Sequence, residues 1–187
     1  MNDVLTAIAE RFSCRSFTDK MPGEDCLNAI TQAALQAPSG MNRQYWHVIL
    51  VKNKEIMSEM QAEGMEFLSN MPDKTMYERM MSRGGKLFYN APCMALVLIK
   101  EADPKGAELI DCGILCQNMV LAATSLGMAS LHCGLAKLAF AGGKGQEFKK
   151  RLKFPEGYDL GLAVLLGYAK DITTPHEPNA EKITVVE

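Results

Sequence analysis

The segment Ile110–Met128 constrains the fold of this chain most strongly, because it is apolar or small on almost every side. It is expected to be helical, and its only strongly polar residues are Asp111, Gln117 and Asn118. A helix without a polar face has no side that favours water. In a chain of 187 residues, such a helix must lie at the centre of the fold or in a subunit interface. We therefore expect an obligate homodimer.

Composition and charge exclude several classes of protein. Hydrophobic residues make up 48% of the chain and charged residues 22%, which is typical of a globular protein. The net charge of −2 argues against a nucleic-acid partner. The N-terminus lacks the apolar core of a signal peptide, and the runs 94–99 and 161–168 are strand-sized, so no membrane partner is expected. The six cysteines are interpreted as reduced thiols of a cytoplasmic protein.

The order of predicted elements indicates an α+β fold. Helices are predicted over 3–12 with Asp3 as the cap, from 24 to 37, over 55–71, from Pro104 to 126, and around 145–152. Strands are predicted over 46–52, 93–99, 128–133 and 161–168, with a short strand-like segment at 182–186. Because the strands and helices do not alternate regularly, we expect a mixed β-sheet flanked by helices, in one domain spanning 1–187.

Methionine is concentrated between Met57 and Gly85, where seven of the 13 methionines occur. Flexible thioethers fill irregular gaps in a core and also adapt to flat ligands. One interpretation is a helical segment packed on the core, which we favour for most of these residues. The other is a lid over an adaptable pocket, with Gly84 and Gly85 as its hinge.

The segment Arg11–Phe17 carries Arg11, Ser13 and Arg15 at every second position. In an extended chain these residues face one side, so two guanidinium groups and a hydroxyl would point to one place. That combination suits a phosphate group. The alternative is that Arg11 ends an exposed helix and Arg15 is merely solvated, and the pattern taken alone favours this alternative.

A second candidate segment is the loop Ala37–Trp46, which is rich in Pro, Ser, Gly and Asn. Its amide side chains, Asn42 and Gln44, both donate and accept hydrogen bonds, as a heterocycle with carbonyl and N–H groups requires. The alternative is an ordinary Asx-type turn followed by a buried Trp46.

These two segments, their spacing and the later Phe88–Pro92 (FYNAP) together resemble the nitroreductase-like family of FMN-dependent oxidoreductases. The resemblance covers 7–52, 88–99 and 111–127 and ends with 160–171, so the chain is similar to a short member of that family. Three positions depart from the family pattern. Tyr45 stands where Pro usually precedes the Trp, Glu181-Lys182 replaces a stronger basic cluster, and both Arg83 and Lys86 are candidates for the cation near the flavin N1 and C2 carbonyl.

The resemblance implies a nitroreductase-like fold and an intertwined homodimer with FMN at the subunit interface. The first arginine segment corresponds to the phosphate and ribityl contacts, the 38–44 loop to the part that reaches FMN from the partner subunit, and 131–134 to the flavin edge, where a backbone N–H of Cys133 or Gly134 contacts N5. Lys182 corresponds to a basic residue near the phosphate. The implied FMN-binding residues are Arg11, Phe12, Ser13, Arg15, Pro38, Ser39, Met41, Asn42, Gln44, Leu131, His132, Cys133, Gly134 and Lys182.

The implied activity is that of an FMN-dependent NAD(P)H oxidoreductase. Hydride would pass from NADH or NADPH to flavin N5, and then, in a ping-pong cycle, to an electron-poor acceptor such as a nitroaromatic or a quinone. The alternatives are a flavin dimer with oxygen-dependent or specialised redox chemistry, and a non-enzymatic flavin carrier or sensor. No residue is assigned as catalytic acid or base, and no metal site is expected. His132 and Cys133 are adjacent on a predicted strand, so their side chains should point to opposite faces.

Overall fold

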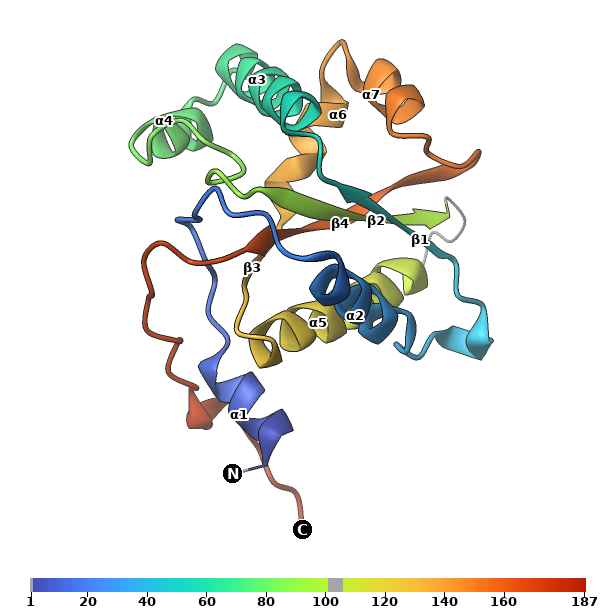
Figure 1. The fold of residues 1–187 in the computed structure, drawn as a ribbon, viewed down its shortest axis with the longest axis vertical. Coiled ribbons are helices and arrows are strands. Elements are labelled where there is room, and N and C mark those ends of the chain that lie inside the picture. The colour runs from blue at the N-terminus through green and yellow to red at the C-terminus, as the bar shows by residue number, and fades with distance from the viewer. Residues whose placement is uncertain (1, 101–105) are drawn as a thin grey trace.

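A four-stranded sheet with helices on both faces forms the centre of the computed structural model, which describes residues 2–100 and 106–187 (Figure 1). The strand order is β1-β2-β4-β3, and all three neighbouring pairs are antiparallel. The strands are β1 (Trp46–Val51), β2 (Cys93–Lys100), β4 (Tyr158–Gly167) and β3 (Ala129–Cys133). The α+β class is confirmed. The expected mixed sheet is wrong for these strands, since the only parallel pairing in the described residues is an isolated bridge between Ser13 and Ser130.

The continuous apolar run of β2 reflects burial on both faces of the sheet. Met94, Leu96 and Leu98 contribute to one hydrophobic cluster, and Cys93, Ala95 and Val97 to the other. The first cluster lies under α3 (Lys54–Asn70), α6 (Leu138–Ala141) and α7 (Gly145–Arg151), and the second under α2 (Glu24–Leu35) and α5 (Ala107–Ser125). Because alternate residues of a strand face opposite sides, a strand covered on both faces must be apolar throughout.

Helix α5 packs closely on the sheet on one side. A side chain at Gly161 of β4 would place its Cβ 2.8 Å from Cys112 Sγ of α5 and 3.0 Å from Ile99 Cγ2, so only glycine allows this approach. The helix ends at Ser125, one residue before the predicted end at 126, and Gly127 just beyond it has a φ of +69° that favours glycine. The prediction that no apolar run reaches membrane-spanning length was wrong, because α5 meets that criterion by length and composition. Its packing against α2 and the sheet is that of a core helix.

The other side of α5 remains open within one chain. Ile110 is 66% exposed, Leu109 50% and Ile114 37%, although the opposite side of the helix is buried. Helix α1 (Asp3–Glu10) packs beside α5 and exposes Val4 and Leu5 in the same way. A single chain therefore buries the apolar residues on one side of α5 and leaves those on the other side exposed.

The predicted elements nearest the two chain ends differ from the structure. The cap of α1 is Asn2 rather than Asp3, since Asn2 Oδ1 accepts a hydrogen bond from the Leu5 N–H at 3.0 Å, and the helix stops at Glu10. Pro104, the predicted start of the long helix, lies outside the described residues. The segment 182–186 is not a strand, because a short 3₁₀ helix (Ala180–Lys182) is followed by chain without regular structure.

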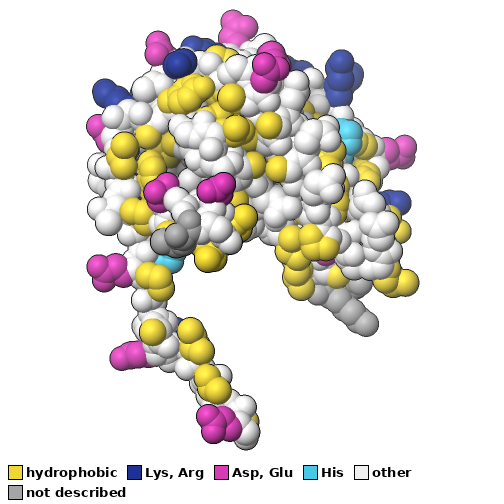
Figure 2. All heavy atoms as spheres, turned by 60° about the horizontal axis from the view of Figure 1, so that its bottom comes forward, with side chains coloured by type: hydrophobic (Ala, Val, Ile, Leu, Met, Phe, Trp, Pro, Cys, Tyr) yellow, Lys and Arg dark blue, Asp and Glu magenta, His cyan; other side chains and the backbone are white. Residues whose placement is uncertain are grey.

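The C-terminal tail runs past α1 and ends away from the sheet (Figure 1). In Figure 2 a narrow arm with hydrophobic side chains extends from the main body. Ile183, Val185 and Val186 of the tail are 74%, 77% and 89% exposed. Within the described part of the chain, the segment 182–186, whose alternating apolar pattern predicts a strand, pairs with no other strand.

The methionine-rich region forms α3 and a separate short helix, α4 (Thr75–Met81). Met57, Met60 and Met80 are buried in the core, which confirms the packing interpretation for them. Met71, Met76 and Met81 remain 37%, 39% and 50% exposed. Gly84 and Gly85 both adopt positive φ in the turn after α4.

Candidate functional site

The arginine segment leaves α1 as an extended chain and is held by backbone hydrogen bonds. The Cys14 N–H donates to Ser130 O of β3 at 3.0 Å, and the Phe17 N–H donates to Tyr89 O at 3.4 Å. Cys14 and Phe17 are buried, while Arg15 is exposed. Burial also raises the pKa of the Cys14 thiol. The segment therefore lies between the edge strand β3 and the turn 88–92, with the Arg15 side chain directed outward.

A cavity of about 240 Å³ brings together residues from four distant parts of the sequence. Arg15 lies on one wall, the strand end Leu131–Gly134 forms another, and α4 with the following turn forms a third. Its lining comprises Arg15, Met76, Arg79, Met80, Arg83, Tyr89, Leu131, His132, Cys133, Gly134 and Leu135. We call it the arginine cavity.

The arginine cavity is strongly cationic. Three guanidinium groups line it, those of Arg15, Arg79 and Arg83, and no carboxylate does. In the described part of the chain, none of the three forms an ion pair within 4.0 Å. Arg15 Nη1 donates to Ser13 O at 3.5 Å, which leaves most of these donors available. Planar guanidinium groups without an acidic partner suit an anionic ligand with several oxygens, such as a phosphate or a carbonyl-bearing ring. The donor set is therefore compatible with FMN.

Of the two cations considered for the flavin ring, Arg83 lines the arginine cavity. Lys86 instead donates from Nζ to Asn90 Oδ1 at 2.7 Å. Sequence reasoning missed Arg79, along with Met76, Met80, Tyr89 and Leu135. Helical spacing could have indicated part of this set, because residues 76, 79, 80 and 83 recur on one side of the α4 region.

His132 and Cys133 point in different directions, as predicted for neighbours on a strand. Cys133 Sγ is directed at Leu87 O at 3.6 Å, and burial raises the pKa of its thiol to about 11. Burial lowers the pKa of His132, and the positive charge of Arg11 lowers it further. A hydrogen bond with the Cys116 backbone raises this pKa, but by less than burial lowers it. The two side chains do not form a nucleophile–base pair, and at neutral pH Cys133 is a protonated thiol.

The 38–44 loop lies at the other end of the molecule from the arginine cavity, beyond α2 and α5 on the right of Figure 1. Met41 is 86% exposed, and Met41, Asn42 and Gln44 have φ values of 55°, 54° and 50°. The Gln44 N–H donates to Ser39 Oγ at 3.0 Å, and Gln44 Nε2 donates to Asn42 Oδ1 at 2.8 Å. Trp46 after the loop is buried. The loop is thus presented to the outside and does not reach the cavity of its own chain.

Four other predicted residues do not line the arginine cavity. Arg11 lies near His132, while Phe12 packs against the core and Ser13 makes the bridge to Ser130. Lys182 is exposed in the C-terminal tail. The structure therefore unites Arg15 with 131–134 and leaves the loop and the tail apart from them.

Comparison with known proteins identifies the family. The sequence profile of the nitroreductase family matches residues 8–168. The chain belongs to the nitroreductase family. A nitroreductase from Desulfitobacterium hafniense, solved with bound FMN, is 57% identical with a TM-score of 0.95 over all of both chains. An FMN-bound nitroreductase from Bacteroides fragilis is 31% identical with a TM-score of 0.90, also over all of both chains.

A further relative of this nitroreductase-family chain has a named activity. The NAD(P)H-dependent FMN reductase of Bacillus subtilis is 25% identical over 173 residues, which cover 91% of this chain and 68% of that protein. The family resemblance seen in the sequence is therefore confirmed.

Proposed function

We propose that this member of the nitroreductase family is an FMN-dependent NAD(P)H oxidoreductase that passes reducing equivalents to an electron-poor acceptor such as a nitroaromatic or a quinone. The single observation that carries the proposal is the arginine cavity, with three guanidinium groups that form no ion pair among the described residues, beside the strand end 131–134. Relatives of the same fold that are 57% and 31% identical bind FMN. Bound FMN supplies the redox chemistry by accepting hydride from the nucleotide and transferring it onward.

The protein's own residues supply binding and orientation. Arg15, Arg79 and Arg83 would provide positive charge for the anionic parts of the cofactor, and Cys133 and Gly134, which line the same cavity, would hold the flavin edge. Arg83 is our candidate for the cation beside the flavin N1 edge. Replacing Arg83 with Gln should lower the flavin reduction potential, because a positive partner stabilises the reduced, negatively charged ring. Lys86→Gln is the matched variant. A larger fall in the flavin reduction potential in Lys86→Gln than in Arg83→Gln would assign this cation to Lys86 instead.

We further infer that two chains form an intertwined homodimer and that the 38–44 loop of each completes the cofactor site of the other. The exposed strip of Ile110 and Ile114 on α5, the exposed loop and the apolar tail support this arrangement. Lys182, in that tail, is placed near the phosphate by the same proposal. The six free thiols support a reducing, cytoplasmic location. Sedimentation of a stable monomer that still retains FMN would contradict the shared site.

The decisive experiment is the visible absorbance spectrum of the purified protein, repeated without oxygen after adding NADH or NADPH. We expect a flavin spectrum that bleaches with at least one nucleotide and recovers on adding a quinone. A flavin spectrum that persists with both nucleotides would instead favour a carrier or sensor. A protein that binds no FMN even after incubation would contradict the proposal as a whole.

A further inference from the structure

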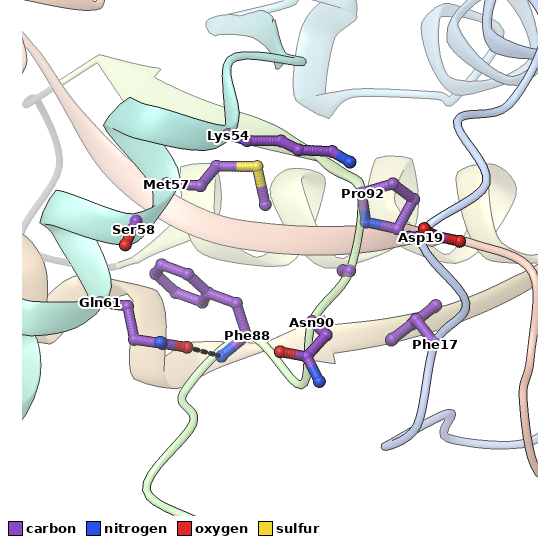
Figure 3. Close-up of a pocket in the computed structure, with 10 residues that line it drawn as sticks. Phe17, Asp19, Lys54, Met57, Ser58, Gln61, Phe88, Asn90 and Pro92 are labelled. Atoms are coloured by element: carbon purple, nitrogen blue, oxygen red, sulfur yellow. Dashed lines mark hydrogen bonds between the residues drawn. The ribbon is translucent and has the colours of Figure 1, made fainter.

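A second cavity is lined by other residues of the turn 88–92, which also contributes Tyr89 to the arginine cavity. Figure 3 shows the side chains that line this second cavity. Its volume is about 430 Å³, within the range of small-molecule sites. Tyr89 lines the arginine cavity, whereas Phe88 and Asn90 line the second one. Tyr89 and Asn90 have φ values of 50° and 60°, so this turn is held in a conformation that is uncommon for side-chain-bearing residues.

The floor of the second cavity is apolar. Phe17, Met57, Phe88 and Pro92 line it, and all four are buried. In Figure 3, Met57 and Phe88 lie on one side of the space, with Pro92 and Phe17 on the other. Two aromatic rings and a flexible thioether favour a flat or branched apolar group.

The rim of the second cavity carries one charge of each sign. Lys54, on the first turn of α3, and Asp19 both line it and are both exposed. Among the described residues, neither forms an ion pair within 4.0 Å. The neighbouring Lys52 differs in this respect, since it pairs with Glu24 at 2.7 Å. In Figure 3, the Lys54 side chain runs across to Pro92, and Asp19 lies beyond Pro92.

Two amides add hydrogen-bond donors to this rim. Gln61 Oε1 accepts from the Phe88 N–H at 3.3 Å, and Asn90 Oδ1 accepts from Lys86. Their oxygens are therefore engaged, while each NH₂ group remains able to donate. With Lys54, these groups favour a carboxylate, and Asp19 provides the acceptor for an ammonium group.

We propose that the second cavity binds an α-amino acid with an apolar, preferably aromatic, side chain. The carboxylate faces Lys54, the ammonium faces Asp19, and the side chain fills the space between Phe17, Met57 and Phe88. A zwitterion is favoured over a singly charged molecule because it satisfies both rim charges at once. This site is separate from the arginine cavity, and the proposal does not depend on the oxidoreductase function.

The test is calorimetric titration of the full-length protein with three compounds that share one ring. The probes are L-phenylalanine, 2-phenylethylamine without the carboxylate, and 3-phenylpropionate without the ammonium. We expect L-phenylalanine to bind at least tenfold more tightly than either analogue. Equal affinities for all three, or no binding of L-phenylalanine up to about 10 mM, would overturn the proposal.

Rim variants identify the site. Lys54→Met and Asp19→Asn should each weaken L-phenylalanine binding at least tenfold and remove its advantage over the analogue that lacks the matching charge. Both positions are exposed, so neither change disturbs the core. Lys150→Met, on the exposed surface of α7, is the matched control and should bind like the native protein. Arg15→Gln should also leave this binding unchanged, and a loss in that variant alone would move the ligand to the arginine cavity and refute the proposal.

Discussion

Replacing Arg15 with Gln should change the stability of the flavin-free protein and its affinity for FMN in opposite directions. Arg15, Arg79 and Arg83 line one cavity of about 240 Å³ without a carboxylate. Unit charges about 8–10 Å apart in water repel by roughly 0.4–0.5 kcal/mol per pair. Removing Arg15 relieves two such pairs, or about 1 kcal/mol before salt screening reduces it. For a chain of this size, a gain of that order raises the melting temperature by at most about 2–4 °C.

The same substitution removes a charge-assisted contact to the cofactor. Such contacts contribute about 1.5–3 kcal/mol, and the exposure of Arg15 favours the lower end. FMN should therefore bind roughly tenfold more weakly. The assay compares thermal melting of the flavin-free protein with fluorescence titration of FMN, and Lys150→Gln is the control. A variant that melts lower without flavin would indicate a structural role for Arg15, and unchanged FMN affinity would refute its assignment.

Four further outcomes are expected. Cys26, the only free cysteine in the described residues that is not buried, should react first with a thiol reagent in the native protein, and Cys26→Ser should abolish that fast phase. The free energy of unfolding should fall as the pH drops below 6.5, the ordinary pKa of histidine, because burial disfavours the His132 cation; His132→Gln should flatten this fall and His176→Gln should not. Ile110→Glu should shift the sedimenting species toward monomer, while Lys150→Glu leaves it unchanged, because Ile110 is 66% exposed on the open side of α5. Gly161→Ala should destabilise the fold by roughly 1–3 kcal/mol in chemical denaturation, since its Cβ would lie 2.8 Å from Cys112 Sγ.

Elements with a strong local pattern were predictable from sequence. The run Cys93–Ile99 can only be buried on both faces, and it forms β2 at the centre of the sheet. The long helix ends within one residue of the predicted position, next to Gly127, whose backbone conformation favours glycine. Arg15 and Leu131–Gly134 meet in one cavity, as the family resemblance implies, although 115 or more residues separate them in the chain.

Features that depend on long-range pairing were not predictable. Strand direction is set by connections across the whole chain, so the sequence predicts a mixed sheet, whereas the four strands are antiparallel. Arg79 was missed because its role arises only when α4 folds against the strand end at 131–134. Local spacing carries no information about which distant segment faces a given side chain.

Helix α5, the sequence feature that most constrains the fold, also has apolar residues that a single chain leaves exposed. The pattern of α5 predicts that no side faces water, yet Leu109, Ile110 and Ile114 remain exposed when only one chain is considered. The 38–44 loop has three side-chain-bearing residues at positive φ and lines no part of the arginine cavity of its own chain, and the tail exposes a strand-like apolar sequence. Strained and apolar exposed segments persist where a partner stabilises them. The proposed homodimer, in which a second copy would cover α5, receive the tail and accept the loop, would account for all three observations with one interface. Ile110→Glu should therefore weaken FMN binding together with dimerisation, although this residue does not line the arginine cavity.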